Sequence, residues 1–175
     1  MSTLELVVPT GSVVDRTPVS APAARSRVSA HRLALVVNGK PNAGPILRAL
    51  AAHLGADLPI RSADATDKTS AAVALTDDEA AAVAAEADVA ILGVGDCGAC
   101  TACSIDDAVK LERLGVPTVT VITEPFQGLA AEFALRLGMP ALTTVVLPHP
   151  VASRPESDLL DLTARVATAA AAALT

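Results

Sequence analysis

The stretch Asp88-Val-Ala-Ile-Leu-Gly-Val-Gly-Asp-Cys-Gly-Ala-Cys-Thr-Ala-Cys103 decides the fold. Val89-Ala-Ile-Leu92 is an apolar run between Asp88 and Gly93, which predicts a buried strand at residues 88–92. All three cysteines of the chain follow within seven residues, at Cys97, Cys100 and Cys103. We expect these thiols on the loop between a strand and a helix, where open α/β proteins bind their ligands.

Strands and helices alternate on both sides of this stretch. The apolar patterns predict strands at residues 31–37, 58–61, 118–123 and 142–147, and helices at residues 43–54, 125–137 and 156–174. Residues 62–75 have the composition of a polar connection, and capping-box patterns at Thr76 and Ser104 predict the starts of two more helices. The alternation predicts an α/β fold with an open, mainly parallel sheet and helices on both faces, flavodoxin-like or Rossmann-like.

Length and composition favour one domain with an extended arm before it. The chain has 175 residues, of which 51% are apolar, enough for a single core built from Ala, Val and Leu. Residues 1–30 are rich in Ser, Pro and Val and predict an extended N-terminal arm, whereas residues 31–175 predict a single α/β domain.

Charge and composition exclude several classes of partner. A net charge of −6 and the absence of Trp and Tyr remove the basic surface and the stacking platforms that nucleic acids need. No apolar run is long enough for a membrane span, and the N-terminus lacks the pattern of a signal peptide. We therefore expect a cytoplasmic protein that binds neither nucleic acid nor membrane. Clustered cysteines in cytoplasmic proteins are typically catalytic, redox-active or metal-binding.

Polar residues follow each predicted strand and should meet at one edge of the sheet. Besides the cysteines, these residues are Asn38, Gly39, Lys40 and Asn42 after the first strand, Thr123 and Glu124 after the fourth, and His149 after the last. We expect Asn38, Gly39, Lys40, Asn42 and Thr123 to contact a small-molecule substrate. Glu124 and His149 are candidates for proton transfer, although Glu124 could equally begin a helix before Pro125 and His149 could be an ordinary loop residue.

Four segments resemble the motifs of the UGSC family, which is named for selenocysteine-Gly-Ser-Cys. They are Asn38-Gly-Lys-Pro-Asn-Ala43, Gly93-Val-Gly-Asp-Cys-Gly-Ala-Cys100, Thr123-Glu-Pro-Phe126 and Pro148-His-Pro150, and the resemblance runs from about Pro9 to Pro150. It puts Cys97 at the selenocysteine position and Cys100 at the following cysteine, which implies a redox or nucleophilic role for Cys97. Ala99 replaces the serine of the motif, and Ile105-Asp-Asp107 stands where the family has Val-His-Asp.

The residues alone also make Cys97 a candidate nucleophile. A thiol before a helix N-terminus is favoured as a thiolate by the unpaired N–H groups, and Lys40 would add a positive charge. Asp96, Asp106 and Asp107 would act in the opposite direction, so the sign of the net pKa shift stays open. The Cys-x-x-Cys spacing lets Cys100 resolve an intermediate on Cys97, with an external thiol as reductant. Cys103 is then a spare thiol or a second resolving thiol of the catalytic group.

Two other uses of the same segment stay open. Three thiolates could bind a metal ion or an iron–sulfur cluster, with His149 or Glu124 as a fourth ligand, although no cofactor is firmly implied. Gly93, Gly95 and Gly98 fit the glycine pattern of dinucleotide-binding loops. Against that, Cys97 occupies the place of the pyrophosphate, and Ser104 predicts a helix start six residues after Gly98. The apolar surface of the last helix from Val166 onward is a candidate homodimer interface.

Overall fold

A five-stranded parallel sheet forms the centre of the molecule. The computed structural model describes residues 19–25 and 31–175, and its strands lie in the order β2-β1-β3-β4-β5. This is the strand order of flavodoxin-like proteins, and it confirms the α/β fold expected from the sequence. The strands are β1 His31–Val37, β2 Ile60–Asp67, β3 Val89–Gly95, β4 Thr118–Thr123 and β5 Thr144–Leu147.

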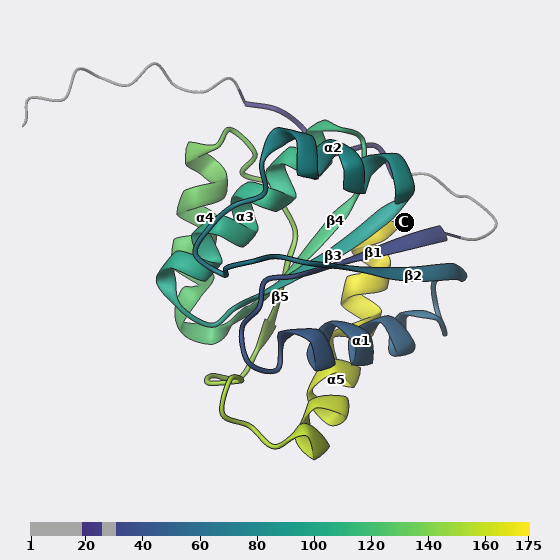
Figure 1. The fold of residues 1–175 in the computed structure, drawn as a ribbon, viewed down its shortest axis with the longest axis vertical. Coiled ribbons are helices and arrows are strands. Elements are labelled where there is room, and N and C mark those ends of the chain that lie inside the picture. Colours follow the sequence, from purple (N-terminus) through teal and green to yellow (C-terminus); the bar gives the residue numbers. More distant parts are fainter. Residues whose placement is uncertain (1–18, 26–30) are drawn as a thin grey trace, which may run out of the picture.

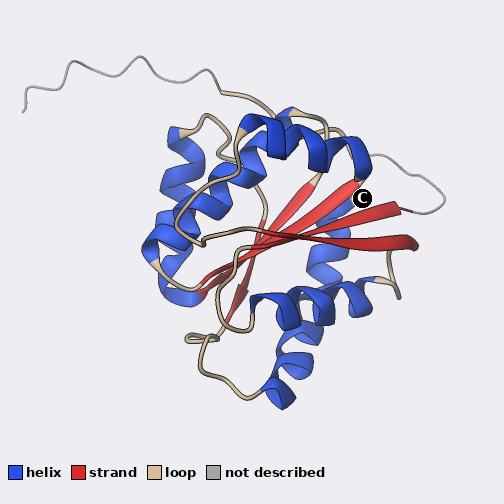
Figure 2. Cartoon of the chain, in the orientation of Figure 1, coloured by secondary structure: helices blue, strands red, loops and turns tan. Residues whose placement is uncertain are grey.

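Helices cover both faces of the sheet, as right-handed crossovers between parallel strands require. Helices α1 Ala43–Leu54 and α5 Glu156–Leu174 pack together on one face (Figure 1). Helices α2 Asp77–Glu86, α3 Gly98–Arg113 and α4 Gln127–Arg136 lie on the other, with the short turn η1 Glu124–Phe126 before α4. The sheet is thereby enclosed between two helical layers, and the connecting loops lie beyond the strand ends (Figure 2).

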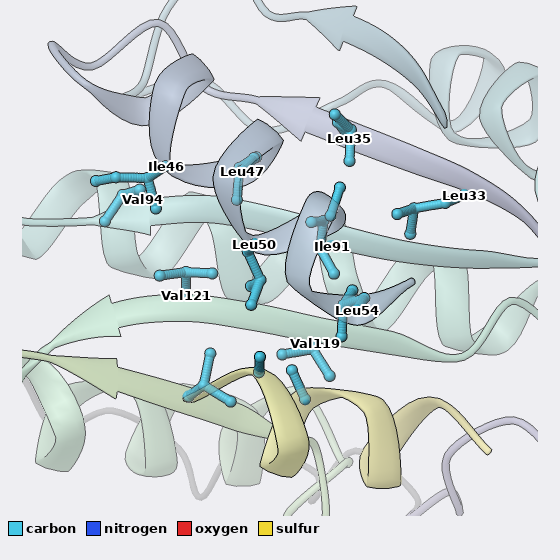
Figure 3. Packing of buried hydrophobic residues seen from close by; sticks show 14 of the residues in the cluster. Leu33, Leu35, Ile46, Leu47, Leu50, Leu54, Ile91, Val94, Val119 and Val121 are labelled. Atoms are coloured by element: carbon cyan, nitrogen blue, oxygen red, sulfur yellow. The ribbon is translucent and has the colours of Figure 1, made fainter. Parts of the chain in front are cut away.

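The larger core lies between the sheet and the layer of α1 and α5. Ile46, Leu47, Leu50 and Leu54 repeat at helical spacing along α1 and are fully buried. Figure 3 shows them against side chains of β1, β3 and β4, among them Leu35, Ile91 and Val121. Each such side chain contributes about 1.5–3 kcal/mol through burial, so this layer fixes β1 and β3 as the rigid centre of the sheet.

Strand β2 is longer than its sequence predicts. The short strand expected at residues 58–61 is in fact Ile60–Asp67, and the polar connection begins only after it. The strand lies at the edge of the sheet and most of its side chains are exposed, so Ser62-Ala-Asp-Ala-Thr66 needs no apolar pattern. Its main-chain pairing with β1 holds it instead.

Helix α3 begins six residues earlier than expected. Ser104 does not cap it, because the helix runs from Gly98 with Cys97 as its N-cap, and Ser104 is buried in its second turn. Cys100 and Cys103 therefore lie on the helix rather than on the loop before it. Smaller differences are the extension of β3 to Gly95, the start of β5 at Thr144 rather than at residue 142, and the 3-10 turn before α4.

Residues 19–25 carry no helix or strand and lie against the body of the domain. The side chain of Arg25 forms an ion pair with Glu112 at 2.9 Å, and the backbone N–H of Ala23 donates to the same carboxylate at 2.6 Å. Glu112 also accepts hydrogen bonds from the backbone and hydroxyl of Thr118. The rest of the expected arm, residues 1–18 and 26–30, lies outside the described residues.

Most of the apolar side of α5 faces the core. Leu162, Ala170 and Leu174 are buried against the sheet, and Val166 is partly buried there. The homodimer interface from Val166 onward therefore stays a prediction. Within residues 19–25 and 31–175, no helix combines the length and apolarity needed to cross a membrane.

Candidate functional site

Two glycines bring the start of α3 directly onto the end of β3. Gly93 has φ +151°, and a Cβ there would lie 2.9 Å from the carbonyl oxygen of Val121 on β4. A Cβ on Gly95 would lie 2.7 Å from Oγ1 of Thr101 on α3. Both contacts are too short for any side chain, so glycine is required for this close packing. It places Cys97 at the carboxyl edge of the sheet, next to the turn after β1.

Cys97 and Cys100 cap α3 reciprocally through sulfur. The N–H of Cys100 donates to Sγ of Cys97 at 3.3 Å, and the N–H of Cys97 donates to Sγ of Cys100 at 2.9 Å. This is the geometry of a capping box, with thiols in place of the usual hydroxyl and carboxylate. The two sulfur atoms lie 2.7 Å apart. A disulfide, with a bond of about 2.05 Å, is therefore within reach of a small movement.

The two thiols differ in acidity. Burial raises the pKa of Cys97, but hydrogen bonds from the thiol and backbone of Cys100, with the charge of Lys40, outweigh it and leave that pKa below its ordinary value. Burial and the neighbouring Cys97 raise the pKa of Cys100 to about 11. Cys97 is thus the more acidic thiol of the pair.

The turn after β1 brings Lys40 to Cys97. Gly39 adopts φ +76°, which lets the chain reverse there. Asn38 is buried, and its amide donates to the carbonyl of Val94 at 2.9 Å while its oxygen accepts the N–H of Lys40 at 3.2 Å. Asn38 therefore holds the turn in place, and Lys40 is the residue of this segment that acts on the thiol.

Asn42 joins the same turn to the loop after β5. It has φ 66°, a conformation that asparagine tolerates better than most residues. Its amide nitrogen donates to the carbonyls of Val151 and Arg154, both at 2.9 Å. These bonds occupy the amide nitrogen of Asn42, a residue that we expected from the sequence to contact substrate. Asn42 therefore fixes the loop after β5 at the edge of the site.

Asp96 links His149 to the cysteine segment. Its carboxylate is nearly buried, with 4% of the side chain exposed, and its Oδ1 lies 2.9 Å from Nδ1 of His149. The hydroxyl of Thr123 donates to the same oxygen at 3.0 Å, and the N–H of Ala152 donates to Oδ2 at 3.1 Å. His149 therefore stands at this edge, as expected, beside a carboxylate that directly precedes Cys97.

Glu124 is exposed in the first turn of η1. Its backbone carbonyl accepts a hydrogen bond from Gln127 at 3.2 Å. Next to it, the ring of Phe126 meets that of His149 edge to face, with centroids 5.8 Å apart. Glu124 thus lies at the outer rim, and Phe126 supplies an apolar wall beside the imidazole.

Cys103 faces a different environment from the other two thiols. Burial raises its pKa, with Asp107 and Asp106 adding to the effect and Lys68 opposing it. Lys68 forms a buried ion pair with Asp107, which also accepts the N–H of Leu75 at 2.6 Å. In residues 19–25 and 31–175, no three His, Cys, Asp or Glu side chains are placed to hold one metal ion.

The early start of α3 also bears on the dinucleotide alternative. Gly98 is the first residue of the helix, so the argument from a late helix start was wrong. The sulfur of Cys97 nevertheless accepts the N–H of Cys100, one of the groups that a pyrophosphate would need. Gly93 and Gly95 are accounted for by the close packing of β3 against β4 and α3.

Sequence analysis missed two residues of this region. From the sequence, Asp96 was considered only as a negative charge that raises the pKa of nearby thiols. Asp96 nevertheless follows the end of a strand, which is the criterion that selected the other candidates. Lys68 follows a strand end that the sequence concealed, because β2 was read as ending at residue 61. Applying the strand-end rule to every polar residue would have found Asp96, whereas only the structure could reveal Lys68.

Comparisons with known proteins found similar solved structures and one family model. A diflavin flavoprotein from Nostoc sp. is 13% identical, with 85% of this chain and 95% of that one covered and a TM-score of 0.46. A flavodoxin-like domain from Synechococcus sp. is 10% identical, with 78% and 95% covered and a TM-score of 0.38. No curated protein matches. The model of the UGSC family matches residues 5–175, nearly the whole chain, and the protein therefore belongs to the UGSC family.

Proposed function

We propose that this protein is a thiol-dependent enzyme that acts on a small electrophilic molecule. Cys97 is its attacking thiolate and Cys100 its resolving thiol. The observation that carries the proposal is the sulfur capping box, in which one thiol has a lowered pKa and its partner 2.7 Å away has a raised one. A low-pKa thiol beside a protonated partner is the arrangement that thiol–disulfide exchange uses.

The surroundings give the other residues their proposed roles. Lys40 stabilises the thiolate, and Asn38, Gly39, Asn42 and Thr123 shape the edge where substrate binds. His149 and Glu124 stand at the rim as candidates for proton transfer. A small-molecule dithiol would return an oxidised Cys97–Cys100 pair to the thiol state, and the cytoplasm is the reducing compartment in which we expect the protein to work.

The test is the pH dependence of alkylation at each cysteine, followed by peptide mapping on reduced protein with and without a chelator. We expect Cys97 to be alkylated first, with an inflection below that of free cysteine at about 8.5, and Cys100 to resist until the pH approaches 11. Equal protection of all three thiols until the chelator is added would favour the metal-binding alternative and contradict the proposal.

A further inference from the structure

Asp96 determines which nitrogen of His149 is free. Its carboxylate already accepts the backbone N–H groups of Val151 and Ala152, at 3.3 and 3.1 Å. Those donors and the Thr123 hydroxyl make the ionised, accepting form of Asp96 the one that fits. The remaining partner, Nδ1 of His149 at 2.9 Å, therefore carries the hydrogen that it donates to Oδ1. Nε2 is left without a partner among the described residues.

Nε2 of His149 lies at the carboxyl edge of the sheet, where the candidate site is. The His149 side chain is 36% exposed, whereas that of Asp96 is 4% exposed. Asp96 and Cys97 are consecutive residues, about 3.8 Å apart at Cα, so the residue that holds the imidazole directly precedes the thiol. Phe126 packs edge-on against the ring, with an interplanar angle of 71°, and limits its rotation.

We propose that His149, held by Asp96 through Nδ1, takes up a proton on Nε2 and passes it to the leaving thiolate when Cys97 opens a disulfide, which makes alkyl disulfides the substrate class of this site. The inference rests on the proposed function and narrows it. An alkyl thiolate is strongly basic and leaves slowly without a proton, whereas an aryl thiolate leaves readily by itself. A positioned proton donor accelerates only the first kind of substrate.

The steps balance as follows. The neutral His149 ring carries its hydrogen on Nδ1, so Nε2 first takes up a proton from solvent. The Cys97 thiolate then attacks one sulfur of the alkyl disulfide, the sulfur–sulfur bond breaks, and the departing thiolate takes that proton from Nε2. Cys100 then loses its proton and attacks Sγ of Cys97, and the second substrate thiolate leaves and takes up that proton. The substrate gains two electrons and becomes two thiols, while Cys97 and Cys100 become a disulfide. A dithiol reductant reverses that oxidation.

The experiment compares two substrates at fixed pH with a dithiol present: bis(hydroxyethyl) disulfide and the aryl disulfide dithiobis(nitrobenzoate). We expect His149→Gln to slow the alkyl reaction about 100-fold and the aryl reaction less than about threefold. His53→Gln is the matched control, because this other surface histidine lies on α1 with Nε2 3.2 Å from the carbonyl of Leu160. An equal loss on both substrates, or no loss on either, overturns the inference.

A second readout does not depend on activity. Long-range nitrogen–proton NMR of the neutral His149 ring should show the hydrogen on Nδ1 in the wild-type protein, and Asp96→Asn should move the ring toward the Nε2–H form. The same variant should lose rate selectively on the alkyl disulfide. An Nε2–H ring in the wild-type protein contradicts the role of Asp96, and this measurement stands even if Asp96→Asn does not fold.

Failure of the inference and failure of the proposed function give different results. If Cys97→Ser still opens either disulfide at the wild-type rate, or the wild-type protein opens neither, the proposed function is wrong and the inference falls with it. If Cys97→Ser is inactive but His149→Gln shows no preference between leaving groups, the proposed function stands and the inference alone is overturned.

Discussion

Helices α2 and α3 begin with the same hydrogen-bond pattern made from different atoms. At α2, Oγ1 of Thr76 accepts the N–H of Glu79 at 3.2 Å, and the Glu79 carboxylate accepts the N–H of Thr76 at 2.7 Å. At α3, the sulfurs of Cys97 and Cys100 take those two places. The residues of the α2 box are exposed. The α3 box lies at the sheet edge, where replacing oxygen by sulfur turns a helix cap into a dithiol.

The acid–base behaviour of the two boxes differs accordingly. Hydrogen bonds from the backbone and hydroxyl of Thr76 lower the pKa of Glu79, which is ionised at neutral pH in any case. At α3, hydrogen bonds of the same kind lower the pKa of Cys97 toward neutrality. In that range, a change in pKa alters the fraction of the thiol that is ionised. One geometry therefore stabilises the helix at α2 and, under the proposed function, supports reactivity at α3.

The largest effect is expected for Cys97→Ser. Serine is among the best N-cap residues, so the helix keeps its cap and the melting temperature should stay equal or rise. The nucleophile is lost, and turnover of a disulfide substrate should fall by at least about 10³-fold. Parallel thermal unfolding and activity measurements check both parts. A variant that loses its fold together with its activity would mean that the sulfur cap is structurally required.

Cys100→Ala should separate the two displacement steps. Cys97 still attacks, but no thiol resolves the product, so a mixed disulfide of one substrate half per protein should accumulate and be visible by intact-protein mass spectrometry. The pKa of Cys97 should rise, because the bond from the Cys100 thiol is lost. Undiminished turnover with no adduct would show that Cys100 does not resolve the intermediate.

Lys40→Met should have a smaller effect, confined to acidity. Lys40 lowers the pKa of Cys97 by its charge and by a hydrogen bond, so its removal should move the inflection of Cys97 alkylation to higher pH. The rate should fall at neutral pH and match that of the wild-type protein well above the inflection, where all Cys97 is thiolate. A loss of equal size at every pH would instead assign Lys40 to substrate binding.

Thr76→Ala should change stability alone. Loss of this N-cap should cost about 1 kcal/mol of the free energy of unfolding, because the N–H of Glu79 loses its acceptor. The disulfide-exchange rate should stay that of the wild-type protein. Urea denaturation and an activity assay on the same sample provide the check, and a lowered rate would link α2 to the site.

Sequence reasoning succeeded where local pattern and tertiary packing agree. The predicted bounds of β1, α1, β4 and α5 coincide with the structure, since each carries apolar spacing matched to its buried face. It failed for β2, whose edge position needs only main-chain pairing. It failed for the start of α3 because Ser104 is a strong N-cap residue by propensity, while the sulfur cap at Cys97 has no such rule.

The candidate site was predictable in outline only. The strand-end rule brought Cys97, Lys40, Thr123 and His149 to one edge, and the structure places them there. The partners of each residue were not predictable, because Asp96 meets His149 across 53 positions and Asn42 meets Val151 across 109. Contacts at such separation depend on how the strands align, which no local window contains.

The loop after β5 has an unusual number of anchors for a segment with no helix or strand. Asn42 binds the carbonyls of Val151 and Arg154, and Asp96 binds the N–H groups of Val151 and Ala152. The segment 149–154 is thus tied to the N-cap of α1 and to the residue that follows β3. The amides of Val151 and Ala152 should therefore exchange with deuterium as slowly as those of a packed helix, and a ligand that reaches His149 should find the ring on a segment that is already rigid.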